Sequence, residues 1–583
     1  MRVTRGRTAH LFPIEKIKTM KLHLPKALLL SVVAIVATGA AQAVTTVTPQ
    51  EVVDSEADLK AALTTDTPVK VVTGQYTDDK GIHDIAYTKP VVWESAEKTT
   101  ISGFDANITA PLYVREGDLT IENSNLNSVI APGISQSQIV VSGKNSSLTF
   151  SGTNFTDSSC GGFMQVGGPD GAGTVNITNS SNVEFYFSIN AGHHKNADWN
   201  QYFYIINSTT DTAQGGERYE DGLYQSPEGS TREYGKATIN VNSGSTLTVG
   251  TSLFLAEADL NIDDATVNNK RGGDGFSNPD YWNRLGRQTS STTNVNITNG
   301  GAWNTNGGSI VTGVQDLNGT EVNITVSGTK DGKASTLNVR GAEHGTIALG
   351  IGTQSDSAAN NKNVTTLTIA DGGKVLAKDI MLGVQEAKGY YGNDTVTVEV
   401  GAGSSMESDL ITIAKGATVT NYGTIVGDIT LQDNGSLISC GGVISGLEAT
   451  GGTFAVYGGM GTKGDITLAG ASFIFTDGAV IDLKGNDFTY GEGNSITIIM
   501  SNIMLADADG EYVLQGLTFE NAGSVTGLTE DVEVTLVSGA DDTEGTKVTL
   551  KASDIKVNSI PEPTTATLSL LALAALAARR RRK

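Results

Sequence analysis

The sequence predicts an all-β protein whose strands stack as the coils of a β-solenoid. The interior of the 583-residue chain has no helical periodicity. Clusters of Gly, Asn, Ser and Thr instead separate short alternating runs such as TVNIT, ATINV, NVNIT, TTLTI and TVTVEV, which are typical of strands between turns. A short unit also recurs with variable insertions, which favours stacked coils over a sandwich.

The repeated unit contains two apolar pairs separated by a Gly or Ser turn. The first pair of each unit is Val175/Ile177, Ile239/Val241, Val295/Ile297, Leu367/Ile369 and Val398/Val400. The second pair follows about 12 to 15 residues later, at Phe187/Ile189, Leu253/Leu255, Ile310/Val311, Ile380/Leu382 and Ile411/Ile413. We expect these pairs to face the core of one solenoid over residues 66–484, with the insertions as loops.

The N-terminal sequence predicts a secretory signal peptide over residues 1–43. Lys21 and Lys26 precede an eleven-residue apolar run, and Ala41 and Ala43 supply the small residues that signal peptidase needs. The run is short of the roughly 20 residues that span a bilayer, so a permanent membrane helix is the weaker alternative. Cleavage would leave Val44 as the first residue, and a start at Met20 would give a signal of ordinary length.

Residues 44–65 are expected to cap the first coil with a short amphipathic helix. Ser55 to Asp58 resemble a capping box with Asp in place of Glu or Gln, and Leu59, Ala62 and Leu63 share one face of the helix. The segment that follows, residues 69–103, has a Gly-x-Tyr turn and a Lys-Pro-apolar strand that ends in Thr-Ile-Ser-Gly. It resembles the opening coils of pectate-lyase-type β-helices, and the repeats resemble autotransporter passengers. These resemblances imply a right-handed parallel β-helix, of about 17 coils and roughly 80 Å if each coil takes about 20 residues.

The chain ends in two further segments. Residues 485–560 carry longer runs such as SITIIM, VEVTLV and KVTLKA between hairpin-like turns, which predict an antiparallel β module that covers the last coil. Residues 561–583 then combine Pro561-Glu562-Pro563, an apolar stretch, and the basic residues Arg579, Arg580, Arg581, Arg582 and Lys583.

This tail resembles the PEP-CTERM sorting signal of Gram-negative bacteria. The fifteen apolar-stretch residues, 564–578, rise about 22 Å as a helix, which is short of a hydrocarbon core of about 30 Å. The resemblance implies transient anchoring in the inner membrane, recognition by an exosortase, and delivery to the cell surface or an exopolysaccharide matrix. An ordinary tail anchor is the alternative reading of the same residues.

Charge and motifs narrow the classes of function. Residues 44–560 carry 28 basic and 61 acidic residues, a net charge of −33, which excludes nucleic acid as a natural partner. Asp507-Ala508-Asp509-Gly510 lacks the rest of an EF-hand loop, and the His193-His194 pair alone is weak support for metal. We therefore expect no metal and no cofactor. Cys160 and Cys440 are 280 residues apart, so we expect two buried, unbonded thiols.

Two insertions stand out for their aromatic residues. Residues 191–235 and 268–292 hold ten of the 35 aromatic residues and five arginines of an otherwise acidic chain. Both follow the second apolar pair of their unit, as does the connection with Tyr390-Tyr391, so we expect them on one face of the rod. Aromatic rings suit the apolar faces of sugars, and Arg suits acidic sugars. The candidate binding residues are Trp199, Tyr202, Tyr204, Tyr281, Trp282 and Arg284; the alternative is that these rings pack within their own insertions.

The sequence thus favours an exported, non-enzymatic surface protein with a structural or adhesive role and a polysaccharide or glycan ligand. No catalytic residue is assigned. The first alternative is a divergent polysaccharide lyase or glycoside hydrolase on the same scaffold. Ice binding is a further alternative, but it requires a regular Thr array, and the sequence units show no Thr ladder in register.

Overall fold

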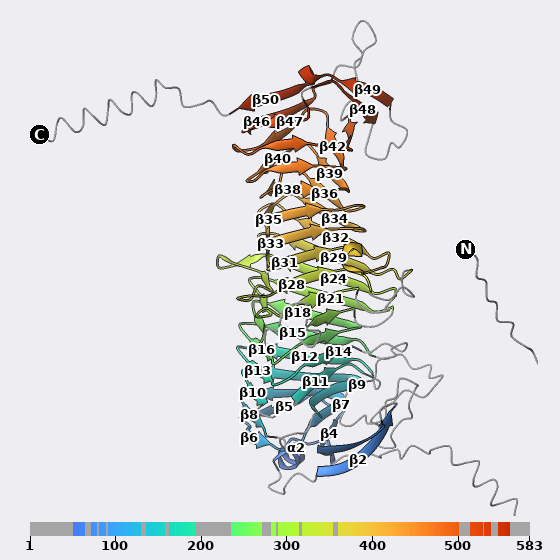
Figure 1. Cartoon of the computed structure of the whole chain (residues 1–583). Coiled ribbons are helices and arrows are strands. Elements are labelled where there is room, and N and C mark those ends of the chain that lie inside the picture. Colours follow the sequence, from blue (N-terminus) through green and yellow to red (C-terminus); the bar gives the residue numbers. More distant parts are fainter. Residues whose placement is uncertain are drawn as a thin grey trace, which may run out of the picture.

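The computed structural model describes residues 51–64, 71–78, 81–88, 91–129, 136–157, 162–168, 171–192, 235–270, 282–286, 290–313, 318–353, 360–500, 514–528, 530–537 and 546–559. Within these residues, 46 strands are linked in one continuous hydrogen-bonded sheet. The sheet winds into a long rod of stacked coils (Figure 1). A typical coil contributes three strands, and each pairs in parallel with the corresponding strand of the next coil, as β12 does with β15. The predicted all-β solenoid is confirmed at this level.

Three parallel sheets, named here in the order in which a coil visits them, run along the rod. The first sheet comprises β5 (Thr99–Ser102), the C-terminal halves of β7 (Leu112–Glu122) and β9 (Gln136–Ser151), β12 (Gly173–Thr178), β15 (Ala237–Asn242), β18 (Ala258–Asp263), β21 (Thr292–Thr298), β24 (Glu321–Ser327), β29 (Val364–Ala370), β32 (Thr395–Val400), β34 (Ala417–Asn421), β36 (Ser436–Ser439), β39 (Thr453–Val456), β42 (Ser472–Thr476), β45 (Ser495–Ile499) and β48 (Val532–Val537).

The other two sheets follow the same order. The second sheet comprises β6 (Asp105–Ile108), β8 (Asn125–Ser128), β10 (Asn154–Asp157), β13 (Asn182–Phe185), β16 (Thr246–Val249), β19 (Thr266–Asn269), β22 (Ala302–Asn304), β27 (Thr336–Asn338), β30 (Lys374–Leu376), the N-terminal halves of β33 (Ser405–Ile413) and β35 (Thr424–Leu431), β37 (Val443–Ile444), β40 (Gly459–Thr462), β43 (Ala479–Asp482), β46 (Leu517–Ala522) and β50 (Ile555–Ser559). The third sheet comprises β1 (Glu51–Val53), β4 (Val91–Glu94), the N-terminal halves of β7 and β9, β11 (Gly162–Val166), β14 (Ile189–Ala191), β17 (Leu253–Leu255), β20 (Asn283–Leu285), β23 (Ile310–Val311), β28 (Thr346–Leu349), β31 (Asp379–Leu382), the C-terminal halves of β33 and β35, β38 (Leu447–Ala449), β41 (Ile466–Leu468), β44 (Phe488–Tyr490) and β47 (Val525–Thr526).

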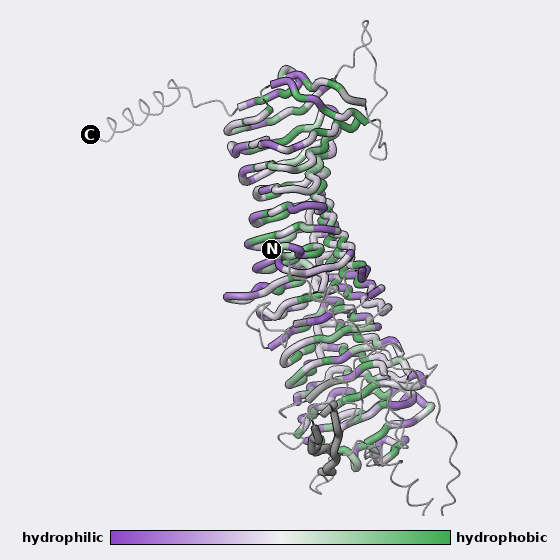
Figure 2. The backbone as a smooth tube through the Cα atoms, turned by 45° about the vertical axis from the view of Figure 1, so that its right-hand side comes forward, coloured by the Kyte–Doolittle hydropathy of each residue, from purple (hydrophilic) through white to green (hydrophobic). Residues whose placement is uncertain are grey.

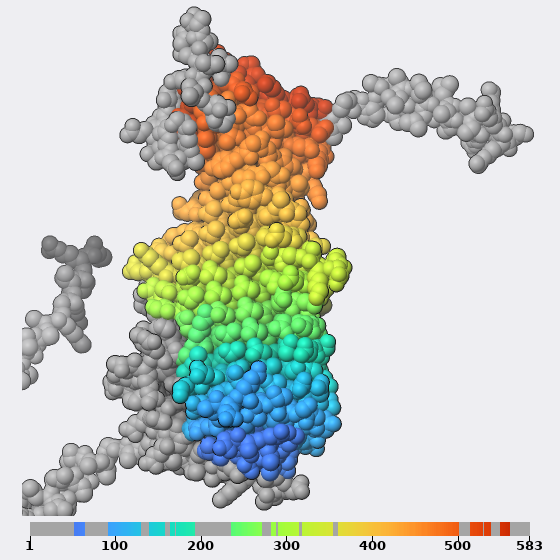
Figure 3. All heavy atoms as spheres, turned by 180° about the vertical axis from the view of Figure 1, so that it is seen from behind, coloured from blue at the N-terminus to red at the C-terminus, as the bar shows by residue number. Residues whose placement is uncertain are grey.

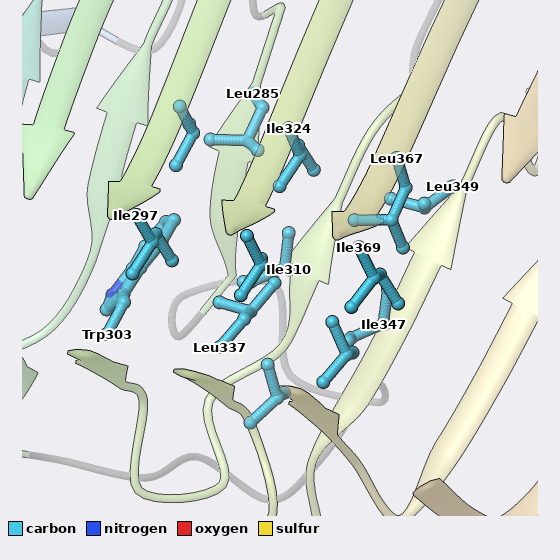
Figure 4. Close-up of a cluster of buried hydrophobic side chains, with 14 of the residues drawn as sticks. Leu285, Ile297, Trp303, Ile310, Ile324, Leu337, Ile347, Leu349, Leu367 and Ile369 are labelled. Carbon is cyan, nitrogen blue, oxygen red and sulfur yellow. The ribbon is translucent and has the colours of Figure 1, made fainter. Parts of the chain in front are cut away.

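The core fills the interior between the three sheets. Alternate residues of each strand point inward, so Val175, Ile239 and Leu260 lie side by side in register and are fully buried. Side chains from different sheets meet inside the rod, as Ile297 and Trp303 do (Figure 4). The tube in Figure 2 shows the same alternation of hydrophobic and hydrophilic residues along the coils.

The structure also contains coils that the sequence repeat did not reveal. A complete coil, β18 to β20, separates the second unit from the third, and another, β24 to β28, separates the third from the fourth. Phe187 lies outside any strand and is half-buried, whereas Phe185 in β13 is fully buried. The described residues hold sixteen strands of the first sheet, which at about 4.8 Å per step gives a stack of roughly 70 Å.

A helix closes the N-terminal end of the rod, as predicted. The helix α2 (Glu56–Leu63) starts at Ser55, whose hydroxyl accepts a hydrogen bond from the Asp58 N–H and donates one to the Asp58 carboxylate at 2.6 Å. Leu59, Ala62 and Leu63 are buried. The helix lies at the blue end of the rod in Figure 1 and packs on β4 and β5.

The predicted opening coils are partly wrong. Residues Val71–Asp78 (β2) and Gly81–Thr88 (β3) form an antiparallel hairpin, a separate two-stranded sheet, instead of a coil. Parallel pairing begins earlier, with β1 on β4, so the solenoid includes part of the segment assigned to the cap. An alternating pattern is shared by hairpins and solenoid strands, and this is why the sequence did not separate them.

The predicted antiparallel module at residues 485–560 is also wrong for most of its strands. β45, β46, β48 and β50 pair in parallel with the preceding coils. Only β49 (Thr546–Leu550), on β48, is antiparallel in this part of the described chain. The solenoid therefore continues to the red end of the rod (Figure 3). The β48–β49 pair and the short helix η5 (Ala552–Asp554) complete this end of the described chain.

Candidate functional site

The outer face of the third sheet carries the described members of the predicted aromatic site. Phe254 of β17 pairs with Arg284 of β20, and Arg284 pairs with Val311 of β23. The column continues through Ala348 and Met381. These residues lie between inward-facing neighbours such as Leu253 and Leu255, so they point away from the core.

Trp282 and Arg284 lie together on this face. The Arg284 guanidinium carbon is 5.4 Å from the centre of the Trp282 ring and 6.0 Å from that of Phe254, within the range of cation–π attraction. All three side chains are half-buried. We name these three residues the third-sheet patch. Phe254 was missed by the sequence analysis, although its position between two inward leucines marks it as an outward aromatic residue.

A small apolar cluster supports this patch. Val311, Ala348, Ile351 and Met381 are buried outside the main core, and Trp282 and Tyr390 pack against them. The short helix η4 (Glu386–Lys388) precedes Tyr390, and the Lys388 ammonium lies 3.0 Å from the Met381 sulfur. Trp282 thus packs on the body of the rod, so the alternative that its ring only packs within its own insertion does not describe it.

The two insertions do not leave the rod at the same point of a coil, which corrects the expectation that they share one face. The first insertion leaves the coil after β14 of the third sheet, but the second leaves after β19 of the second sheet. Residues 283–285, which were assigned to the second insertion, form the solenoid strand β20. The insertions therefore depart at opposite edges of the third sheet. Trp199, Tyr202, Tyr204 and Tyr281 lie outside the described residues.

The outer face of the first sheet carries polar columns in register, which the sequence units did not show. Thr366, Thr397, Thr418, Ser436, Thr453, Ser472 and Ser495 occupy one position on seven consecutive coils. The sequence analysis expected no Thr ladder across the units, and this column is a mixture of Thr and Ser in which only Thr366, Thr397 and Thr418 follow one another as threonines. The strands belong to coils of different length, and this is why the register could not be read from sequence spacing.

An asparagine ladder occupies the same face nearer the N-terminus. Asn240 donates to the Asn176 side-chain oxygen at 2.8 Å, Asn261 to Asn240 at 2.8 Å, and Asn296 to Asn261 at 2.9 Å. Each amide thus bridges two coils on a half-exposed surface. These bonds tie neighbouring coils together and fix their register.

A buried carboxyl group lies at the corner where the chain enters β32. Asp394 is 2% exposed, and its Oδ1 accepts hydrogen bonds from the backbone N–H and the side-chain amide of Asn363, both at 2.9 Å. Burial raises the pKa of Asp394 to about 6, against the lowering effect of the Asn363 hydrogen bonds. Gly313, with φ of +70°, makes room for this carboxyl, because a Cβ there would lie 2.3 Å from Oδ2.

Cys440 is a free thiol, and Cys160 lies outside the described residues. The expectation of a buried Cys440 is wrong, since the residue is half-exposed at the end of β36. Burial of this thiol still raises the pKa of Cys440. The pKa of Tyr422, on the preceding coil, is raised by the neighbouring Cys440 thiol, to which the phenol hydrogen-bonds.

No group of three or more His, Cys, Asp or Glu residues in the described ranges is placed to hold a metal ion. His344 is exposed, whereas His193, His194 and the Asp507 to Gly510 turn lie outside those ranges. Within them, too, no helix is long and apolar enough to cross a membrane.

Comparison with known families identifies one short region of the chain. Residues 559–583 match the PEP-CTERM protein-sorting motif, which confirms the reading of the C-terminal tail. The motif implies an exported, cell-surface-associated protein that an exosortase processes during export. No curated protein and no solved structure gives a significant match.

Proposed function

We propose that this chain is an elongated structural or adhesive protein of the cell surface or extracellular matrix of a Gram-negative bacterium, and that it binds polysaccharide. The observation that supports this proposal is the unbroken ladder of strands from β1 to β50. A ladder of this kind makes one stiff rod, and a stiff rod presents long repeating faces to a polymer.

The third-sheet patch is the first candidate contact, together with Trp199, Tyr202, Tyr204 and Tyr281 as predicted from the sequence. Trp282 offers a ring face to a sugar, and Arg284 offers guanidinium N–H groups to a sugar carboxylate. Residues 44–560 carry a net charge of −33, which repels an acidic polysaccharide. The positive charge of Arg284 is the feature of the patch that would attract one.

Export is proposed to follow two cleavages. Signal peptidase removes residues 1–43 after Ala43, and the C-terminal tail holds the protein in the inner membrane until an exosortase removes it. Protein isolated from the host surface should then start at Val44 and lack Arg579 to Lys583 by intact mass. Surface material that keeps the polybasic tail would show an ordinary tail anchor instead.

The function is tested by affinity gel electrophoresis of the mature protein with a panel of polysaccharides, followed by mass spectrometry of the polymers. Retardation by a polysaccharide with no change in its mass supports the adhesive rod. Unsaturated products would favour the polysaccharide lyase, and hydrolysed products the glycoside hydrolase. Free migration in every gel would contradict the proposal.

A further inference from the structure

A second face of the rod has the composition of a carbohydrate-binding surface. It lies on the outside of β34, β36, β39 and β42, which stack directly on one another (Figure 1). Three columns run along these four coils. We name them together the first-sheet strip: the hydroxyl column Thr418, Ser436, Thr453 and Ser472, the aliphatic column Thr420, Ile438, Ala455 and Ile474, and the phenol column Tyr422, Cys440 and Tyr457.

The register of the strip is fixed by the backbone. Thr418 pairs with Ser436, and Thr420 pairs with Ile438. The ladder extends past the ends of the strands, since the Cys440 N–H donates to the Asn421 carbonyl at 2.9 Å and the Tyr457 N–H to the Ser439 carbonyl at 2.8 Å. The side chains of each column therefore repeat at the coil spacing of about 4.8 Å.

The strip is accessible to a ligand. Tyr422 is 46% exposed, and Ile438, Ile474 and Tyr457 are half-buried. Ala455, which lies between Ile438 and Ile474 in register, is buried. Residues 360–500 are all described, and the corners of these coils are short, so that only residues 432–435 connect β35 to β36. A polymer can therefore lie along the columns without meeting a long loop from these coils.

The strip carries no formal charge. None of its members is Lys, Arg, Asp or Glu. The pKa of Cys440 is raised by burial, and the pKa of Tyr457 is raised by burial and by Cys440, so thiol and phenols stay neutral near pH 7. In line with the aliphatic column, the nearest carboxylate is that of Glu399, which pairs with Thr420 and lies one coil before the strip. An anionic polymer would meet no cation here and would be repelled by the acidic chain.

The chemistry of the columns matches that of an uncharged sugar chain. Hydroxyl groups of Thr and Ser both donate and accept hydrogen bonds, as sugar hydroxyls do. Tyrosine rings and isoleucine side chains cover the apolar C–H faces of a pyranose. The spacing of about 4.8 Å is close to the length of one glycosyl residue, so successive sugars would meet equivalent groups on successive coils.

We propose that the first-sheet strip binds an extended, uncharged polysaccharide that runs parallel to the axis of the rod. This inference rests on the proposed polysaccharide-binding function and adds a binding face and a ligand class to it. The third-sheet patch, with its arginine, is then the contact for acidic sugars, and the strip is the contact for neutral ones.

The test compares variants of the mature protein in affinity gels that contain cellulose derivatives without charge, xylan, mannan or dextran, with polygalacturonate and alginate as anionic probes. Tyr422→Ala combined with Tyr457→Ala should weaken retardation by a neutral polymer at least tenfold. Tyr391→Ala is the matched control, because Tyr391 is 40% exposed on another face and its loss should leave retardation by the neutral polymer unchanged. The single variant Tyr422→Ala, which removes an exposed ring, provides a second measure if the double variant unfolds.

Each outcome decides between the proposals. Neutral polymers that retard the parent and the strip variants equally would overturn the strip and leave the function intact. If only anionic polymers retard the parent, and Trp282→Ala abolishes that retardation, the strip is likewise overturned and the proposed function stands. No retardation by any polymer would overturn the strip and the proposed function together. Adsorption of the parent to ice, lost in Tyr422→Ala without any polysaccharide binding, would assign the strip to ice instead.

Discussion

The outer faces of the first and third sheets differ although the same coils build both. On the first sheet, outward residues such as Asn261 and Thr418 are half-exposed and polar. On the third sheet, outward residues such as Gln165, Val311 and Ala348 are buried. The connections explain part of the difference, because the chain that leaves the third sheet after β31 packs Tyr390 back onto that face, whereas the first sheet is followed by short turns such as residues 179–181.

This difference shows that the pattern of inward-facing residues predicts the core of each sheet but not the exposure of its outer face. The core requires alternate apolar residues in every strand of both sheets, and so it makes the sheets look alike in sequence. The outward residues and the corners decide which face is open to a ligand. Four predictions test this division between core, covered face and open face.

The largest effect is expected inside the rod. Trp303 is fully buried, and its Nε1–H donates to the Asn269 side chain at 3.0 Å. Trp303→Ala should lower the free energy of unfolding by about 3 to 5 kcal/mol, because it opens a large cavity and removes the hydrogen bond that the Asn269 Oδ1 accepts from the indole. Chemical denaturation measures the loss. A loss below that of Trp282→Ala would contradict the placement of these two rings.

The second effect depends on pH. The folded pKa of Asp394 is about 6, above the ordinary value of 3.8, so the folded protein binds more protons than the unfolded chain between these values. The contribution of Asp394 to the free energy of unfolding is therefore fully present below pH 3.8. It is lost as the pH rises to and through 6, by up to about 3 kcal/mol in total. Asp394→Asn should stabilise the protein at pH 7 and change it little at pH 3.5. Equal effects at both pH values would show that burial does not perturb this carboxyl.

The third effect concerns the covered face. Trp282→Ala should cost about 1 to 2 kcal/mol of stability, since a half-buried ring leaves the apolar cluster of the third sheet. It should also weaken binding of polygalacturonate by about 1 kcal/mol or more, while circular dichroism stays unchanged. Arg284→Lys is the matched variant that keeps the charge but loses the planar guanidinium. Unchanged binding in both variants would remove the third-sheet patch from the function.

The smallest effect is expected on the open face. Asn261→Ala removes one hydrogen bond to Asn240 and one from Asn296, and should cost about 1 kcal/mol, since both bonds are half-exposed. Thr397→Ala, at an exposed position of the same sheet, should lower the free energy of unfolding less, which thermal or chemical denaturation of both variants can measure. If Asn261→Ala and Thr397→Ala lose the same stability, the asparagine ladder does not stabilise the register of the coils.

Much of the fold could be predicted, because the alternating pairs in β12, β15, β21, β29 and β32 occupy the inward positions that were expected of them. The coil that contains Leu260 and Ile262 was missed, since its corner is interrupted by residues 270–282 between β19 and β20. The strand β20 was hidden because its first inward residue is Asn283, which is fully buried and does not match an apolar pattern. The β2–β3 hairpin was predicted as a coil, although the Asp78 to Gly81 segment is a turn signal.

The candidate site was less predictable than the fold. Trp282 and Arg284 were selected from the composition of one insertion, but Phe254 joins them only through the pairing of β17 with β20. The first-sheet strip unites residues from coils of unequal length, such as Tyr422, Cys440 and Tyr457. Its columns depend on registers over 17 to 19 residues that no local pattern specifies.

Hydroxyl-radical footprinting of the mature protein, with and without a neutral polysaccharide that retards it, can show whether the polymer lies on the first-sheet strip. We expect Tyr422 and Tyr457 of the first-sheet strip to become protected from oxidation, while Tyr391, which is 40% exposed on another face, keeps its rate. Protection of Tyr391 and Trp282 with unchanged oxidation of Tyr422 would contradict the claim that the open face of the first sheet binds the polymer.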